Sequence, residues 1–230
     1  VAAHSFTSAP VVYVSTGLNF PDSLSAGAAA GAKHAPLLLV NGGASSVDAA
    51  TASLLRSLGT TTIVVIGGPA VMSPALAADF GRFGTVVPVA GGDRFETSQR
   101  IIESSFANSS RVILANGLNF PDALSASAWA GKSASPLFIT PGGCVPQRTL
   151  DDTYFLGATH VTVAGGAAVQ GEDVAALTSC GGWSIIAPDY PALALGKAAS
   201  QKSGGESSGD GHAIGSSLPV NPLTHGTAGR

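Results

Sequence analysis

Short apolar runs alternate along this chain with longer segments that are either amphipathic or rich in alanine, glycine and serine. Continuous apolar runs of this length are typical of parallel strands that are covered by helices on both faces. In the first part of the chain we expect strands at 11–15, 37–40, 62–66 and 86–90, and helices at 22–33, 47–58 and 74–80. This alternation predicts an α/β fold with right-handed crossovers.

The same pattern returns about one hundred residues later. Three pairs of segments match: GLNFPD at 17–22 and 117–122, APLLLV at 35–40 with SPLFIT at 135–140, and LGTTTIVVIGGPAV at 58–71 with LGATHVTVAGGAAV at 156–169. We therefore expect further strands at 112–115, 137–140 and 161–164, and further helices at 122–132, 147–156 and 171–178. Long-period self-similarity indicates tandem structural units. The two units should share one strand order, with the NFPD turns at equivalent sheet edges.

These limits divide the chain into a first unit at 1–84, a second unit at 85–190 and a tail at 191–230. The tail is rich in serine and glycine and has no periodic apolar face, so we expect it to be flexible. Residues 182–190 weakly resemble 85–93 and are a candidate fourth strand of the second unit.

One helix start is well marked. In GGDRFETSQRII, Asp93 has the position of an N-cap and Glu96 follows three residues later, which is the capping-box pattern. By repeat alignment, residues 1–6 correspond to the end of an equivalent helix. The start of that helix would lie upstream of Val1, so we expect the chain to be a processed or truncated piece.

Composition and charge exclude several classes of function. The net charge of −3 disfavours nucleic-acid binding, which needs a basic surface. No apolar run is long enough to span a membrane. The chain has no phosphate-binding glycine motif and no metal-ligand spacing, and its GESSG match lies in the tail with no strand before it. We therefore expect no cofactor, no metal and no catalysis; a nucleotide-binding or hydrolytic α/β enzyme is a lesser alternative.

The repeated turn contains the first candidate site residues. Proline suits the first position of a helix, aspartate complements the helix dipole in the first turn, and asparagine bonds backbone groups in tight loops. These residues could build the turn alone or could also contact a ligand, and both interpretations remain open. They are Asn19 and Asp22 in the first unit, and Asn119 and Asp122 in the second.

Four segments in particular resemble the signature segments of the cell wall binding repeat, type 2. They are GGDRFETS (91–98), NFPDAL (119–124), SPLFI (135–139) and VTVAGG (161–166). The resemblance covers about residues 1–180, in order and twice, whereas three repeats are common in the family. It implies a toprim-like or Rossmann-like unit with helices on both faces of a small parallel sheet. It also implies an extracellular module of Gram-positive bacteria, attached non-covalently to an anionic secondary cell-wall polymer.

The resemblance also suggests where the polymer binds. The family's proline-plus-aliphatic segment is linked with polymer binding and corresponds here to Pro36, Leu37 and Leu38, and to Pro136 and Leu137. Such a segment also has the pattern of a buried strand, in which case helix N-termini and the nearby Lys33 and Lys132 would supply the contacts. Beside Asp93, Arg94 either pairs locally or holds a phosphate or carboxylate.

Two further expectations follow from an exported, repeated module. Cys144 and Cys180 are the only cysteines, and a disulfide between them is expected outside the cytoplasm. A simple crossover would hold them apart, so the loops must deviate. The small-residue helices at 23–33 and 123–132 permit close approach, either within one unit or between units. The second case favours an alternative function, a structural surface-layer module that associates with itself.

Overall fold

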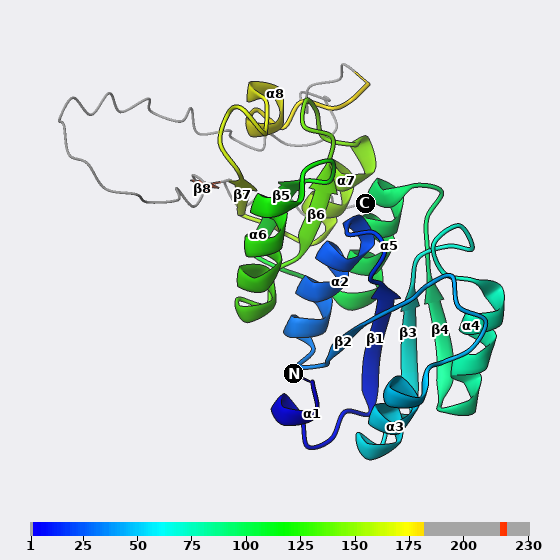
Figure 1. The fold of residues 1–230 in the computed structure, drawn as a ribbon. Helices are drawn as coiled ribbons and strands as arrows, with labels where there is room; N and C mark the ends of the chain where they lie inside the picture. The colour runs from blue at the N-terminus through cyan, green and yellow to red at the C-terminus, as the bar shows by residue number, and fades with distance from the viewer. Residues whose placement is uncertain (1, 182–216, 220–230) are drawn as a thin grey trace, which may run out of the picture.

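Two sheets form the framework of the computed structural model, which describes residues 2–181 and 217–219 (Figure 1). The first sheet has the order β2-β1-β3-β4 and is parallel throughout. Its strands are β1 (Val11–Thr16), β2 (Leu37–Val40), β3 (Thr62–Ile66) and β4 (Thr85–Val89). The second sheet has the order β6-β5-β7-β8. Its strands are β5 (Arg111–Asn116), β6 (Leu137–Thr140), β7 (His160–Ala164) and β8 (Ser217–Pro219).

The predicted equivalence of the two units is confirmed for three strands of each sheet. Tyr13 pairs with Leu37 as Ile113 pairs with Leu137, so even the register is repeated. The fourth position differs, because β4 is parallel to β3 whereas β8 is antiparallel to β7. Since β4 extends the first sheet, it belongs by pairing to the first unit, although the expected boundary lay before it. The candidate strand at 182–190 lies outside the described residues.

Helices cover both faces of each sheet, as predicted. They are α1 (Ala2–Ser5), α2 (Pro21–Ala32), α3 (Ala49–Ser57), α4 (Pro74–Asp79) with the 3₁₀ turn η1 (Phe80–Arg82), α5 (Arg94–Ser105), α6 (Phe120–Lys132), α7 (Gln147–Phe155) and α8 (Glu172–Ala175). Several begin where a side chain caps free backbone N–H groups. The Asp48 carboxylate accepts from the amides of Ala50 and Thr51, which starts α3 two residues later than expected.

The first sheet is packed on both faces. On one face, strand residues such as Val12 and Ile63 contact Leu55 of α3 and Leu76 of α4. On the other face, Tyr13 and Ile66 contact small residues of α2 and also Ile101 of α5. The next residue of α5, Ile102, belongs to the core of the second sheet. Helix α5 therefore packs against both units, with Ile101 in the core of the first sheet and Ile102 in the core of the second.

The units also contact each other through α2 and α6, which lie side by side (Figure 1). Leu24 of α2 is buried in the core of the second unit together with Leu137 and Ile139. The Ser127 hydroxyl of α6 donates to the Leu24 carbonyl at 2.6 Å. The small residues of the two helices thus permit packing between the units, the case that sequence left open.

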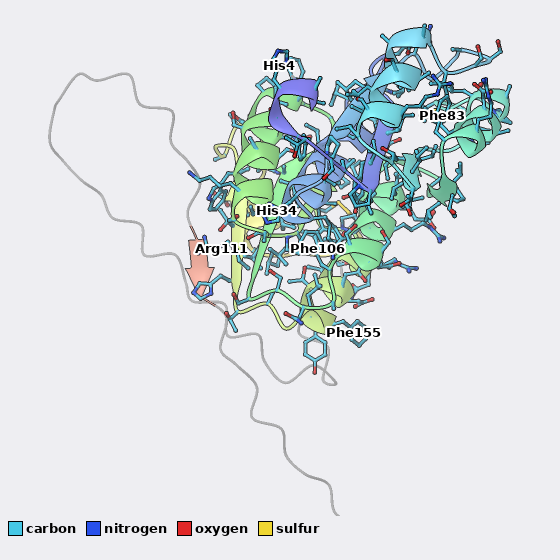
Figure 2. The ribbon with its side chains drawn as sticks, turned by 90° about the horizontal axis from the view of Figure 1, so that it is seen from below. His4, His34, Phe83, Phe106, Arg111 and Phe155 are labelled. Atoms are coloured by element: carbon cyan, nitrogen blue, oxygen red, sulfur yellow. A yellow bond between two sulfur atoms is a disulfide. The ribbon has the colours of Figure 1, made fainter. Side chains whose placement is uncertain are left out.

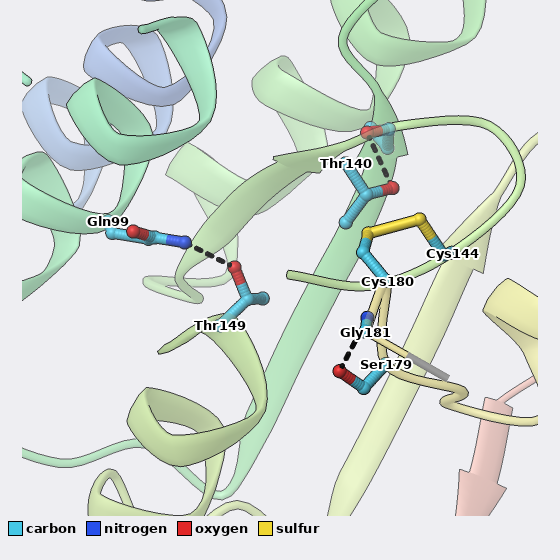
Figure 3. The surroundings of a disulfide bond; sticks show 8 residues. Gln99, Thr140, Cys144, Thr149, Ser179, Cys180 and Gly181 are labelled. Atoms are coloured by element: carbon cyan, nitrogen blue, oxygen red, sulfur yellow. Dashed lines mark hydrogen bonds between the residues drawn. A yellow bond between two sulfur atoms is a disulfide. The ribbon is translucent and has the colours of Figure 1, made fainter. Parts of the chain in front are cut away.

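A disulfide joins Cys144 and Cys180 in the second unit, with 4.9 Å between their Cα atoms (Figure 3). Two departures from a simple crossover make this possible. Helix α8 ends early, and Leu177 has a positive φ of 56° that turns the chain. The chain then runs back beside Val145, whose amide donates to the Thr178 carbonyl at 2.8 Å and whose carbonyl accepts from the Cys180 amide at 2.9 Å.

Candidate functional site

The two NFPD turns lie next to each other at one end of the paired helices α2 and α6. Each turn follows an inner strand of its sheet, β1 or β5. In the first sheet the connection after β1 leads to β2 on one side, whereas the connection after β3 leads to β4 on the other side, and β5 has the same place in the second sheet. In doubly wound sheets, ligands bind at this switch point, outside the carboxyl ends of the strands. The rings of Phe20 and Phe120 contact each other, with 5.5 Å between their centroids. The interface therefore brings two equivalent switch points together.

In each unit the aspartate of the turn lies over a glycine that follows the third strand. A Cβ atom on Gly67 would lie 3.1 Å from Oδ2 of Asp22, and one on Gly165 would lie 2.9 Å from Oδ2 of Asp122. Both glycines have φ near 100°, which disfavours any side chain. Burial raises the pKa of Asp22, and the positive charge of Arg94 opposes that rise. The two carboxylates therefore have equivalent positions in the two units.

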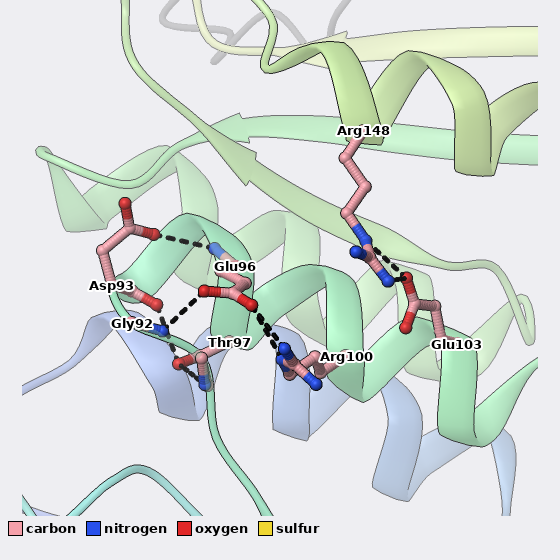
Figure 4. Close-up of polar contacts among 8 residues, drawn as sticks. Gly92, Asp93, Glu96, Thr97, Arg100, Glu103 and Arg148 are labelled. Carbon is pink, nitrogen blue, oxygen red and sulfur yellow. Dashed lines mark hydrogen bonds and ion pairs between the residues drawn. The ribbon is translucent and has the colours of Figure 1, made fainter.

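Arg94 connects the first turn with the second. It is half-buried at the start of α5, close enough to Asp22 to affect its pKa, and its Nη1 donates to the Gly117 carbonyl at 3.0 Å. Asp93 is the N-cap of α5 as predicted, since its carboxylate accepts from the Glu96 amide at 2.8 Å. Glu96 accepts at 2.7 Å from the amide of Gly92, one residue before the N-cap, and not from the Asp93 amide that a capping box would use (Figure 4). The cap fixes the first turn of α5 and hence the position of Arg94.

The starts of α2 and α6 leave backbone donors without a side-chain cap. Asn119 is the N-cap of α6, and its side chain makes no capping bond. Asn19 accepts from the amide of Phe20, at 3.0 Å, and no side chain caps α2. Uncapped N–H groups at a helix start carry partial positive charge and attract anions. Asn19 and Asn119 are both exposed beside these donors.

The remaining predicted site residues lie elsewhere. Lys33 and Lys132 are exposed at the far ends of α2 and α6, away from the turns. The aliphatic segments are strands, as the alternative interpretation had it: Pro36, Leu38, Pro136 and Leu137 are buried, and Leu37 is half-buried. Of these five residues, Leu37 alone borders a pocket in which a ligand could contact it. The structure brings the turn residues together with Arg94 and with Asp93, the N-cap of α5.

An apolar groove of about 770 Å³ runs between α2 and α6 and was not predicted from the sequence. It reaches from the first turn to Lys132, so it joins the two groups of candidate residues. Its apolar lining includes Leu18, Leu39, Phe120 and Leu124, all of which are more than half exposed. A sequence pattern cannot reveal this groove, because the corresponding residues Leu24 and Ile139 are buried.

Comparison with protein families identifies the chain. The model of the family Cell wall binding domain 2 (CWB2) matches residues 1–77 and 89–175. The chain belongs to the CWB2 family. This confirms the resemblance seen in the sequence, and each of the two matched segments corresponds to one unit of the structure. The CWB2 chain is thus a tandem pair of cell wall binding modules.

Similar proteins are longer than this CWB2 chain. N-acetylmuramoyl-L-alanine amidase LytC of Bacillus subtilis (strain 168) is 26% identical over 167 residues, which are 72% of this chain and 33% of the amidase. Cwp6 from Clostridium difficile has a similar structure, with a TM-score of 0.66 and 23% identity over 73% of this chain and 27% of Cwp6. For Cwp8 from Clostridium difficile the TM-score is 0.62, with 22% identity over 75% of this chain and 30% of Cwp8. The chain therefore spans a third or less of each relative.

The part of this CWB2 chain that the structure describes has neither a metal-ligand cluster nor a membrane-spanning helix. Among the described residues, no three His, Cys, Asp or Glu side chains are grouped as metal ligands. Within the same residues, no helix has the length and apolar character needed to cross a membrane. The paired turns and the adjoining groove together form the candidate binding site.

Proposed function

We propose that this CWB2 pair anchors its protein non-covalently to the wall at the outer cell surface, by binding an anionic secondary wall polymer. The observation that supports this most directly is the contact of the two NFPD turns, with Arg94 between them. Arg94 connects Asp22 of one turn with Gly117 of the other, and the uncapped starts of α2 and α6 lie beside it.

The charge of the protein decides how such a polymer is bound. With a net charge of −3, bulk attraction to an anion is absent, so local donors must supply the affinity. The guanidinium of Arg94 has five N–H donors, and one described bond uses its Nη1. A phosphate or carboxylate at the turns would accept from the guanidinium and from the amides at the helix starts.

The duplication of the site follows from the nature of the ligand. A polymer repeats its charged group, and a chain with two equivalent turns offers two equivalent contacts. Binding at the first contact holds the polymer at high effective concentration near the second, which raises the overall affinity without new interactions. Because charged donors of the protein meet charged groups of the polymer at this site, binding should weaken as the salt concentration rises.

Sedimentation with isolated Gram-positive walls tests this proposal. The purified protein should sediment with intact walls and should remain in solution with walls from which the secondary polymers have been stripped. Equal sedimentation with both preparations would reject a secondary polymer as the ligand and would indicate peptidoglycan or nonspecific adhesion.

Substitutions of Arg94 test the site itself. Arg94→Lys keeps the charge but loses the planar fork, and Arg94→Ala loses both, so wall binding should fall in that order. The control is Arg100→Ala on the same helix, which removes an exposed arginine paired with Glu96. If all three variants stay folded by circular dichroism and bind alike, Arg94 is not part of the site.

The open groove favours a second candidate function, association with another CWB2 unit. Leu24 is buried against Ile139 of the neighbouring unit, but their repeat equivalents Leu124 and Leu39 are 59% and 61% exposed. Both exposed leucines line the same groove. A further unit placed in the groove could cover Leu124 with its edge strand, as β6 covers Leu24. The same unit could cover Leu39 with its own equivalent of α2, as α2 covers Ile139.

The oligomeric state tests this candidate. Sedimentation equilibrium should show association at high protein concentration that Leu124→Ser abolishes. The control Phe155→Ser removes another apolar side chain, 75% exposed, that lies outside the groove (labelled in Figure 2). A monomer at all concentrations would leave the groove without a second copy and would reject association of this chain with itself.

A further inference from the structure

A second, polar pocket lies at the N-terminal edge of the second sheet, at the opposite end of β5 from the NFPD turn. Its volume is about 460 Å³, within the roughly 300–1,000 Å³ that is usual for small-molecule sites. The loop before β5, the last turns of α6 and the loop before β6 enclose it. The polar and aromatic residues that line it include Asn108, Ser110, Arg111, Trp129, Ser133 and Ser135.

Arg111 and Trp129 form the chemically distinctive part of this pocket. The guanidinium carbon of Arg111 lies 5.5 Å from the centroid of the Trp129 ring, a cation–π contact, and both residues are half-buried (Arg111 is labelled in Figure 2). Within residues 2–181 and 217–219, no carboxylate pairs with this guanidinium and no acceptor bonds it. The pocket therefore has an available positive charge beside an aromatic ring.

Hydroxyl and amide groups surround this pair. The Ser133 hydroxyl donates to the Trp129 carbonyl at 2.9 Å and lies 3.0 Å from the hydroxyl of Ser135, so the end of α6 is held in place. Asn108 and Ser110 are exposed on the other side of the pocket, and their side chains make no hydrogen bond to any described residue. Asn108 and Ser110 are therefore available to a ligand, whereas Ser133 and Ser135 hold one side of the pocket in place.

The first unit shows that the repeated fold does not require these residues. At the equivalent positions of the first unit, Val11 replaces Arg111, Ala29 replaces Trp129 and Pro10 replaces Ser110. There, Val11 and Ala29 belong to the apolar cluster that is packed against α5. The second unit builds the same strand and helix but has a charged, aromatic and open pocket at this corner.

We infer that this pocket binds one acidic sugar residue of the wall polymer, and this inference rests on the proposed function. The C–H groups of a pyranose ring pack against the part of the Trp129 ring that the guanidinium and the core leave uncovered, as apolar groups do on aromatic rings. The guanidinium of Arg111 holds the carboxylate or phosphate of the sugar through two parallel N–H bonds. Asn108 and Ser110 bond its hydroxyl groups. The polymer thus meets the second unit at both ends of β5.

The fluorescence of Trp129 reports binding directly. The chain has two tryptophans, Trp129 and Trp183, so a Trp183→Phe background isolates the signal. Glucuronic acid and glucose 6-phosphate supply a carboxylate and a phosphate, and at least one should change the fluorescence saturably. The tighter of the two identifies the charged group. Neutral glucose should bind about tenfold more weakly or worse, because it lacks the charge-assisted bonds.

Substitution of Arg111 gives the decisive comparison. Arg111→Ala should weaken binding of the charged sugar about tenfold or more, and Arg111→Lys should have an intermediate effect. The matched control is Arg56→Ala, which removes a cation–π contact of 5.1 Å to Phe83 outside the pocket and should leave sugar binding unchanged. Circular dichroism verifies that each variant is folded.

The results separate this inference from the proposed function. If neither charged sugar binds, if glucose binds as well as they do, or if Arg111→Ala binds like the parent, the pocket inference is wrong even when the protein sediments with walls. If sugars bind in an Arg111-dependent way but the protein does not sediment with intact walls, the pocket is correct and the proposed function fails.

Discussion

Gly31 of α2 and Gly131 of α6 face each other across the contact between the two units. A Cβ atom added to Gly31 would lie 2.7 Å from the Cα atom of Gly131, closer than Cβ atoms come to backbone. One turn earlier, a Cβ on Gly27 would lie 2.6 Å from the Ser127 hydroxyl oxygen. The backbones of the two helices are therefore in contact, and the positions of Gly27 and Gly31 have no space for a larger side chain.

This contact makes the size of residue 31 a determinant of stability. Gly31→Ala should destabilise the protein by about 1–3 kcal/mol, because the added methyl group must push α6 away. Urea unfolding measures the change. Gly81→Ala is the control, since a Cβ there meets nothing within 4 Å, and its effect should stay within about 0.5 kcal/mol. Equal midpoints for the two variants would show that the helices can separate without cost.

The sequence could predict the units but not how they pack. The repeat of GLNFPD and of the apolar runs led to the correct expectation that β1, β2 and β3 have the same strand order as their counterparts in the second sheet. Alanine, glycine and serine on α2 and α6 are equally suited to packing on a sheet and on another helix. Only the structure shows that Leu24 enters the core of the second unit.

Equivalent positions in sequence also have different environments. Leu39 and Ile139 are both aliphatic residues of the second strand, yet the former is 61% exposed and the latter is fully buried. Pattern reasoning treats them alike, because the difference comes from tertiary packing: α5 packs on β6, and α2 contacts β6 more extensively than it contacts β2. For the same reason, the aliphatic site residues could not be separated into buried and accessible ones beforehand.

The Arg111–Trp129 pocket was missed for another reason. These residues are 18 positions apart and form no motif, so motif searches pass over them. A usable signal does exist, namely the positions at which the second unit has a charged or aromatic residue and the first unit has valine or alanine. Comparing the repeats for their differences would have selected Arg111 and Trp129.

A buried serine network should couple the two units energetically. The Ser98 hydroxyl of α5 lies 2.7 Å from the Ser25 hydroxyl of α2 and accepts from the amide of Ile139 at 3.0 Å. Ser98→Ala would leave this buried amide without its acceptor, which costs about 1–3 kcal/mol. We expect a lower urea midpoint in a single transition, followed by circular dichroism, whereas Ser104→Ala on the same helix should have little effect. Two separate transitions would contradict the coupling.

The Cys144–Cys180 disulfide should stabilise the second unit. Its cysteines are 36 residues apart in sequence. Closing such a loop restricts the unfolded chain and contributes roughly 3–4 kcal/mol in the chain-entropy model. The double substitution Cys144→Ala/Cys180→Ala should lower the thermal midpoint, and a reductant should lower that of the parent protein but not that of the variant. A parent midpoint that is unchanged by complete reduction would contradict this role.

Asp152 should make the stability of the protein depend on pH. Burial and the nearby negative charge of Glu103 raise the pKa of Asp152 to about 6 in the folded protein, although Arg148 opposes the rise. Glu103 is itself paired with Arg148 (Figure 4), and Oδ2 of Asp152 has no hydrogen-bond partner among the described residues. Because the folded pKa exceeds the unfolded one, folding favours the protonated carboxyl group. This contribution is complete below about pH 4 and is lost as the pH rises through 6.

Asp152→Asn removes this titration. The change in unfolding free energy that it causes should therefore be more favourable at pH 8, where Asp152 of the parent is charged, than at pH 4, where it is protonated. The gain should be on the order of 1 kcal/mol, since Asp152 is partly exposed and solvent screens its charge. Urea midpoints of variant and parent at both pH values give the difference, in which all other titrating groups cancel. Asp173→Asn, which removes an exposed negative charge on α8, is the control for net charge. An equal gain at both pH values would mean that Asp152 does not titrate in this range.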